Sequence, residues 1–183
     1  MGRLVYMNLA SLDGYIADRA GNFDWAAPDE DVHAAVNDLL RPVGTYLYGR
    51  RVYEVMRAWE DPRIEAGQPA VVRDFAQIWR GAEKIVYSRT LEEATTARTR
   101  LERVFDPAEV RALKEHSGAD LAIGGPGLAA EAFAARLVDE GRLFIAPVAV
   151  GGGTPALPDA RLDLVLADER RIGRFAYLRY TIT

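Results

Sequence analysis

The stretch LAIGGPGLAAEAFAARL, residues 121–137, changes character twice along its length. Residues 121–123 form an apolar run typical of a buried strand, and residues 128–137 predict a helix. Gly124, Gly125 and Gly127 lie at the junction between them. Glycines let the backbone approach a phosphate closely, and the start of a helix offers free N–H groups. The stretch therefore predicts an α/β fold with an anion site at a strand end, with a purely structural turn as the alternative interpretation.

The same alternation of strand and helix runs along the rest of the chain. Apolar runs predict strands over residues 4–9, 45–48, 84–87, 142–150, 162–167 and 174–183. Helical patterns begin near Asp29 and at Arg50 and extend over residues 71–79 and 106–116, while residues 60–69 predict a surface loop. This order predicts one domain over residues 1–183, with three α/β/α layers and a mostly parallel central sheet that has an antiparallel C-terminal strand.

Composition narrows the classes of function. The chain has 183 residues, a formal net charge of −4 and no cysteine. An acidic chain is a poor partner for nucleic acid, because binding the phosphate backbone needs a basic surface. The lack of cysteine excludes disulfides and thiolate metal sites, and two histidines, His33 and His116, do not make a His-rich metal site. No stretch is apolar enough for a signal peptide or a membrane span, so we expect a soluble cytoplasmic protein without a metal.

Two further strand ends carry arginines. Gly49 is followed by Arg50 and Arg51 at the start of a predicted helix, where cations oppose the helix dipole unless an anion lies between them and the helix. Ser88 and Arg89 follow another predicted strand. Ligands bind outside the carboxyl ends of parallel strands, so this set predicts a dinucleotide with an extra phosphate. We therefore expect NADP rather than NAD. The alternative for Arg50 and Arg51 is a pair of solvated surface residues without a ligand.

Several short motifs follow one another in a characteristic order. They are SLDGYIA at residues 11–17, GRRVYE at 49–54, KIVYS at 84–88, IGGPGL at 123–128, and VDE at 138–140 leading to Pro147 and the glycines at 151–153. In this order they resemble the dihydrofolate reductase superfamily, and within it the bacterial branch related to the reductase domain of riboflavin biosynthesis. The resemblance covers nearly the whole chain. It implies a dihydrofolate-reductase-like fold and the activity of an NADPH-dependent reductase.

The resemblance also implies which residues bind the cofactor. Arg50 and Arg51 would face its 2′-phosphate and pyrophosphate, and Ser88 and Arg89 would lie beside the adenosine phosphate. The pyrophosphate would be bound by Gly125, Pro126, Gly127 and Leu128, with Gly49 and Gly124 beside it. The nicotinamide would be held by main-chain groups of Leu9, Ala10 and Ile16. Residues 11–25 would form a mobile loop over the active site. A cis peptide bond would join the glycines at 124 and 125.

His33 marks a departure from the family's pattern. Dihydrofolate reductases carry a carboxylate on the first helix that faces the pterin, and His33 occupies that place here. A histidine, with an ordinary pKa near 6.5, can donate a proton, and a packed helix residue is the alternative. Asp13 is the second catalytic candidate, with a turn cap as its alternative. Of the tryptophans, Trp25 is expected in the pocket or the core, and Trp59 and Trp79 in the core.

We therefore predict a reductase that transfers a hydride from NADPH to a small pterin-like or pyrimidine-like nitrogen heterocycle, at a CH–NH or C=N group. Two alternatives stay open: a ribosylamino-pyrimidine reductase of the riboflavin pathway, and a non-catalytic NADP-binding module. The glycines at 151–153 lie either near the cofactor or in a simple turn. The apolar C-terminal hairpin predicts a homodimer.

Overall fold

The computed structural model describes residues 1–183 and contains a main sheet of eight strands in the order β5-β4-β3-β6-β1-β7-β10-β9. The strands are β1 (Leu4–Ser11), β3 (Val43–Gly49), β4 (Glu83–Tyr87), β5 (Thr99–Glu102), β6 (Asp120–Gly124), β7 (Glu140–Ala146), β9 (Leu164–Ile172) and β10 (Phe175–Ile182). Strands β1 and β3 to β7 run parallel, and β10 runs antiparallel to β7 and to β9. The predicted α/β architecture, with a mostly parallel sheet and an antiparallel C-terminal strand, is confirmed.

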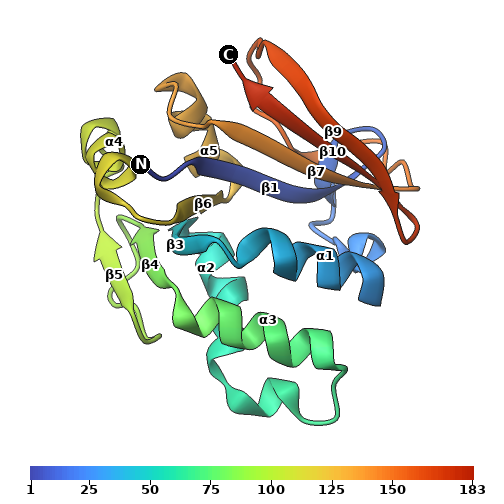
Figure 1. Ribbon diagram of the computed structural model, residues 1–183, viewed down its shortest axis with the longest axis horizontal. Coiled ribbons are helices and arrows are strands. Elements are labelled where there is room, and N and C mark those ends of the chain that lie inside the picture. Colours follow the sequence, from blue (N-terminus) through green and yellow to red (C-terminus); the bar gives the residue numbers. More distant parts are fainter.

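Helices cover both faces of this sheet (Figure 1). The α-helices are α1 (Glu30–Leu40), α2 (Arg50–Met56), α3 (Ala70–Gly81), α4 (Pro107–His116) and α5 (Pro126–Ala134), and the 3-10 helices are η1 (Asp24–Ala26), η2 (Arg57–Glu60) and η3 (Pro62–Glu65). Helices α1 and α3 pack on one face, and α4 and α5 pack on the other. None of these helices combines the length and apolar character that crossing a bilayer requires.

Alternating side chains along the strands build one core on each face. Tyr6 of β1 points toward α5, where its ring meets Phe133 edge to face at 5.4 Å between centroids. On the opposite face Val32 of α1 and Trp79 of α3 are completely buried. Full burial of one large apolar side chain stabilises a fold by about 1.5–3 kcal/mol. The two cores therefore hold the parallel strands, and with them the strand ends, in fixed positions.

The helix boundaries follow local chemistry. Asp29 caps α1, because its Oδ1 accepts from the backbone N–H of Val32 at 2.9 Å, which agrees with the helix start predicted there. Helix α5 starts at Pro126, earlier than residue 128, since proline is tolerated in a first helical turn. It ends at Ala134 rather than at residue 137, because the backbone of Arg136 is left-handed with φ of 53°.

A second, two-stranded sheet lies in segments for which the sequence predicts no strand. It pairs β2 (Tyr15–Asp18) with β8 (Gly153–Pro155), so residues 11–25 hold a strand and the 3-10 helix η1 rather than only a loop. A Cβ at Gly153 would overlap the carbonyl oxygen of Ala17, so only glycine allows this close pairing. Strand β7 ends at Ala146, before residue 150, and the chain then crosses to β8.

Candidate functional site

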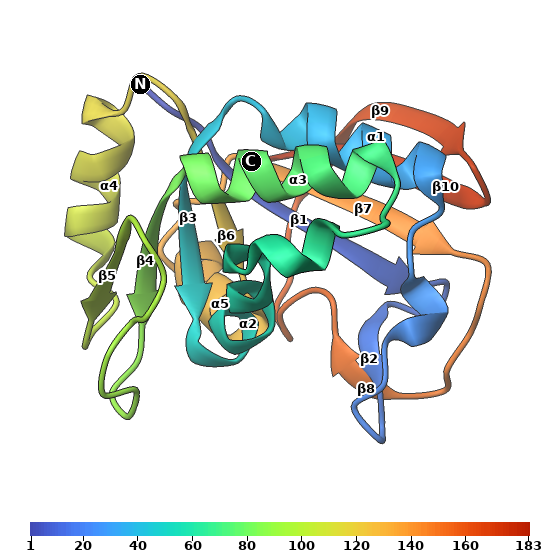
Figure 2. The ribbon, with the colours of Figure 1, turned by 90° about the horizontal axis from the view of Figure 1, so that it is seen from below.

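The carboxyl ends of β3, β4 and β6 meet at one end of the molecule, together with the starts of α2 and α5 (Figure 2). Tyr48 of β3 pairs with Gly124 of β6, and Gly49 pairs with Tyr87 of β4. The β2–β8 ribbon lies at the same end, beyond the end of β1. Residues at or near these strand ends line two cavities, whose linings differ in chemistry.

The first, which we call the arginine cavity, has a volume of about 240 Å³. It is lined by Gly49, Tyr87, Ser88, Arg89, Arg103, Val104, Phe105, Leu128 and Glu131. Four of the predicted cofactor-binding residues, Gly49, Ser88, Arg89 and Leu128, thus line one hollow although they come from three separate strand ends. Such a hollow outside the carboxyl ends of parallel strands is where open α/β sheets bind ligands.

The arginines around this cavity are not equivalent. Arg89 is exposed and has no hydrogen-bond or ion-pair partner in the structure, and the same holds for Arg51, which lies outside the lining. Arg50 is engaged: it pairs with Glu54 at 2.7 Å and donates to the hydroxyl of Thr90 at 2.7 Å. Arg103, which the sequence analysis passed over, donates to the backbone carbonyl of Ser88 at 3.1 Å and holds the loop that carries Arg89. Arg89 is therefore the lining guanidinium that is free to meet an anion.

The glycine turn beside this cavity leads into α5. The peptide bond between Gly124 and Gly125 is trans, so the predicted cis bond is wrong. The chain instead turns through Gly125, whose φ of 98° suits glycine, and a Cβ there would lie 3.3 Å from Val52 Cγ2. No side chain caps α5, and a Cβ at Gly127 would meet nothing within 4 Å. The first N–H groups of α5 are therefore open to an anion.

A buried amide lies on the same side of the sheet. Asn8 follows Tyr6 by two residues on β1, so its side chain lies on the α5 face, just past the last β1–β6 pair at Tyr6 and Ile123. Its Nδ2 is buried and makes no hydrogen bond of normal length. Burial raises the pKa of the Tyr6 hydroxyl, and the Asn8 side chain lies near enough to that group to oppose the shift. A buried donor without a partner is costly and points to a missing ligand or water. No motif singles out Asn8 in the sequence, because its role depends on where β6 stops.

The second hollow, which we call the aromatic cavity, has a volume of about 550 Å³. It is lined by Leu9, Phe23, Asp24, Ala26, Ala27, Pro28, His33, Val36, Met56, Trp59 and Phe75. The ring centroids of Trp59 and Phe75 are 4.6 Å apart, and that of His33 is 5.7 Å from Phe75 and 6.4 Å from Trp59. Trp59 therefore packs against the core on the α1 and α3 face, as predicted, and also lines this cavity, whereas Trp79 is completely buried as predicted.

His33 lies in the wall of this cavity, half-buried on α1. Burial lowers the pKa of its imidazole, and the nearby Asp74 carboxylate opposes that shift. The imidazole makes no hydrogen bond in the structure; only its backbone N–H is engaged, with the carbonyl of Asp29. His33 thus presents a predominantly neutral ring to the cavity near pH 7.

Asp13 lies outside both cavity linings and serves as an anchor. Its carboxylate accepts the backbone N–H of Val150 at 3.1 Å and of Gly151 at 2.7 Å. The Ser11 hydroxyl and these backbone donors lower the pKa of Asp13 to about 2. The carboxylate is therefore ionised at neutral pH and joins the turn after β1 to the segment before β8, which fits the turn-capping alternative for this residue.

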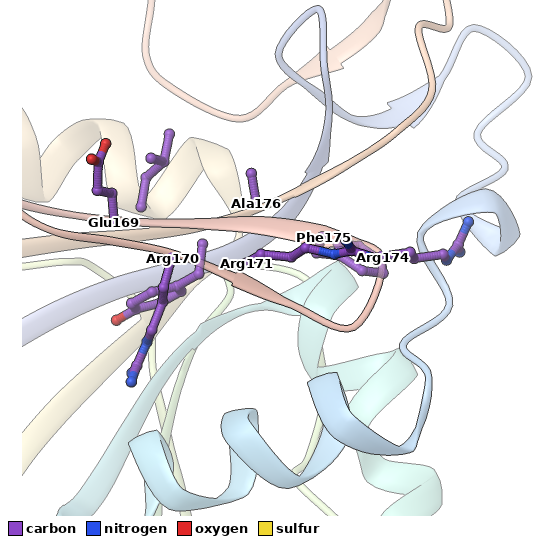
Figure 3. Close-up of a pocket in the computed structure, with 8 residues that line it drawn as sticks. Glu169, Arg170, Arg171, Arg174, Phe175 and Ala176 are labelled. Atoms are coloured by element: carbon purple, nitrogen blue, oxygen red, sulfur yellow. The ribbon is translucent and has the colours of Figure 1, made fainter.

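The segment from Phe23 to Asp29 closes one side of the aromatic cavity and is held by the tip of the β9–β10 hairpin. Arg174 donates to the carbonyls of Trp25 at 3.0 Å and Ala27 at 3.2 Å. Figure 3 shows Arg174 reaching from the hairpin toward this segment. Gly173 has a φ of 53°, and a Cβ there would overlap the Asp29 carboxylate. Trp25 contributes its backbone to this contact, and its side chain does not line the cavity.

The three residues predicted to contact the nicotinamide lie in different surroundings near the carboxyl end of β1. Leu9 lines the aromatic cavity, Ala10 is completely buried in β1, and Ile16 is half-buried in β2. The structure brings Leu9 together with His33, and it places Asp13 and Arg51 outside the two linings.

Comparisons with known proteins agree with this architecture. The model of the RibD C-terminal domain family matches residues 3–173. The uncharacterized protein YyaP of Bacillus subtilis is 30% identical over 173 residues, which are 92% of this chain and 88% of that protein. A crystal structure from Shewanella sp. PV-4 that is assigned to riboflavin biosynthesis superposes with a TM-score of 0.77 at 19% identity and covers 99% of both chains.

A bifunctional deaminase and 5-amino-6-(5-phosphoribosylamino)uracil reductase from Thermotoga maritima superposes with a TM-score of 0.69 at 15% identity, covering all of this chain and 57% of that one. The structural likenesses, at these identities, establish the fold, and the matching family model covers most of the sequence. The chain belongs to the RibD C-terminal domain family.

Proposed function

We propose that the protein is an NADPH-dependent reductase that transfers a hydride to a small nitrogen heterocycle. One observation supports this above all: residues at the carboxyl ends of the parallel strands line both cavities, with Gly49 and Ser88 in the arginine cavity and Leu9 of β1 in the aromatic cavity. A dinucleotide needs an anion-binding part and an apolar part for its reactive ring, and this end of the molecule offers both. Family membership supports the same activity.

The lining residues fit the cofactor. Arg89 and Ser88 would meet the 2′-phosphate, and the uncapped start of α5, from Gly125 to Leu128, would bind the pyrophosphate. The orphaned Nδ2 of Asn8 offers a further donor on the α5 side of the sheet. Leu9 lines the aromatic cavity where the nicotinamide would lie. When bound, the reduced nicotinamide supplies the hydride.

The chain's own residues position the substrate and exclude water. Trp59, Phe75 and Val36 give the aromatic cavity apolar walls, and Arg174 holds the covering segment in place. His33 is the titratable lining residue of the inner wall, so we assign the proton delivered to the ring nitrogen to the protonated form of its imidazole, which is the minor form near pH 7. Asp13 holds the loop beside the site, where its ionised carboxylate keeps two backbone segments together.

The test is NADPH oxidation, followed by the loss of reduced-nicotinamide absorbance, against a panel of dihydropterins, aminopyrimidines and quinoid heterocycles. We expect turnover of at least one ring class and tighter binding of NADPH than of NADH. Tight NADPH binding without turnover of any compound would favour a non-catalytic binding module. If neither cofactor binds, the proposal fails.

A further inference from the structure

We propose that the substrate is a flat, uncharged or weakly basic ring that carries no phosphate and no carboxylate. The inference rests on the proposed function, because it takes the aromatic cavity as the substrate side of the site. It separates this chain from the Thermotoga maritima reductase named above, whose substrate carries a phosphoribosyl group.

The charges around the aromatic cavity carry the argument. None of its eleven lining residues is a lysine or an arginine, and eight are hydrophobic. The one lining carboxylate belongs to Asp24, which is exposed at the rim. His33, the remaining titratable group of the lining, has no hydrogen-bond partner that would favour its charged form. An anion in this cavity would meet one negative charge and no fixed positive one.

Two of the arginines near the cavity are engaged elsewhere, and the third, Arg57, lies outside its lining. Arg80 donates to the carbonyl of Trp59 at 2.9 Å and pairs with Glu65. Arg174 is held by two backbone carbonyls of the covering segment. Arg57, next to Met56, is exposed and does not belong to the lining. The arginine cavity, by contrast, has the free guanidinium of Arg89. A free guanidinium thus lines the cofactor side, whereas no cation lines the aromatic cavity.

The aromatic rings that line this cavity and its volume suit a flat ring. Trp59 and Phe75 stand at 67° to each other, and His33 stands at 72° to Trp59, so the three rings present a mixture of faces and edges. Aromatic groups favour such offset and edge-to-face contacts. A volume of about 550 Å³ lies within the range of small-molecule sites and leaves room for a ring beside the nicotinamide. Asp24 can accept a hydrogen bond from a ring amino group at the rim.

An anionic group would lose its hydration in this cavity without a compensating partner. Burial of an unpaired charge is strongly unfavourable, whereas burial of a neutral aromatic ring is favourable. Within one pair of compounds that share a ring and differ in a carboxylate or phosphate, the neutral member should bind more tightly. This preference is opposite to that of a site built for a phosphoribosyl compound.

Calorimetric titration of the full chain tests the inference, with and without saturating NADP⁺. Two matched pairs serve as ligands: 6-methylpterin against pterin-6-carboxylate, and 5-amino-6-ribitylaminouracil against its phosphate ester. We expect the anionic member of each pair to bind at least about tenfold more weakly than its neutral partner. Equal or tighter binding of an anionic member, or no binding of either neutral ring, would overturn the inference.

Two sets of variants sharpen this test. Asp24→Asn should reduce the difference in affinity between the neutral and the anionic member of each pair, because it removes the negative charge at the rim. Asp24→Lys should reduce this difference further, because it places a positive charge there. Trp59→Phe should retain binding of 6-methylpterin, and Trp59→Ala should weaken it. NADPH affinity is measured separately. If the protein binds NADPH but binds the anionic compounds more tightly than the neutral ones, only the proposed substrate class is refuted. If it does not bind NADPH but still prefers the neutral rings, only the proposed function is refuted.

Discussion

The arginine cavity and the aromatic cavity differ in how the chain builds them. The first uses residues that directly follow strands, such as Gly49, Ser88 and Arg89, and the start of α5. The second collects side chains from β1, α1, α2, η2 and α3, and from residues 23–28. A strand end fixes its neighbours through local turns, so short motifs reveal the first cavity. Only tertiary packing assembles the second.

The two cavities also differ in what they offer a ligand. The arginine cavity presents a free guanidinium close to the open N–H groups of α5. The aromatic cavity presents ring faces and edges with a single carboxylate at its rim. Substitutions in the arginine cavity should therefore change the binding of the cofactor phosphates and leave ring binding intact, and substitutions in the aromatic cavity should mainly change ring binding.

The largest expected effect is at the glycine turn. Gly125→Ala would place a Cβ 3.3 Å from Val52 Cγ2 at a φ of 98°, where a side chain costs about 1–2 kcal/mol. The turn must shift to relieve this strain, and the N–H groups of α5 shift with it. We expect NADPH affinity to fall by more than about tenfold, beyond the loss of stability, as measured by titration and by urea unfolding.

Gly67→Ala is the matched control for this prediction. Gly67 has a similar left-handed backbone, with a φ of 70°, but a Cβ there would meet nothing within 4 Å, and the residue lines neither cavity. It should lose stability without losing NADPH affinity. Wild-type NADPH affinity in Gly125→Ala would remove the phosphate role from the turn.

The next largest effect distinguishes Arg89 from Arg50. Arg89→Ala should weaken NADPH binding by about tenfold or more, because a charge-assisted hydrogen bond contributes about 1.5–3 kcal/mol, and NADH binding should hardly change. Arg50→Ala should cost less, since Arg50 already pairs with Glu54 and Thr90. Titration of both variants with both cofactors checks this order. An equal loss for NADH would mean that Arg89 does not contact the 2′-phosphate.

Some of these features can be predicted from local sequence patterns, and others cannot. Most strands of the main sheet, the α1 start at Asp29 and the strand-end residues follow from periodicity, capping and turn chemistry, which act within a few residues, whereas the order of the strands in the sheet and the short strand β5 are not predicted. Trp59 and Phe75 escape such an analysis, because nothing local shows that their packed rings, together with His33, form one wall of a cavity that residues 23–28 cover. The pairing of β2 with β8 escapes it too, since it joins segments separated by most of the chain.

A smaller effect is expected where the hairpin holds the aromatic cavity closed. Arg174→Ala removes two hydrogen bonds to the covering segment, at Trp25 and Ala27. Each such bond contributes about 0.5–1.5 kcal/mol, so 6-methylpterin should bind several-fold more weakly while NADPH affinity is unchanged. Arg161→Ala, which removes an exposed pair with Asp163, is the control and should change neither affinity. A loss of NADPH binding in Arg174→Ala would show that the two cavities are coupled.

The smallest effect concerns the protonation of His33 within the aromatic cavity. Burial lowers its pKa in the folded protein, so the unfolded chain takes up this proton at a higher pH, near 6.5. Between the two pKa values the unfolded state binds more protons, and the free energy of unfolding therefore falls as the pH decreases below about 6.5.

His33→Gln removes this contribution, so the variant should lose less stability than the wild type between about pH 7.5 and 5.5 in urea unfolding. If His33→Gln loses as much stability as the wild type over this range, the imidazole is not desolvated by the cavity wall, and the apolar character that we assign to that wall would have to come from Trp59 and Phe75 alone.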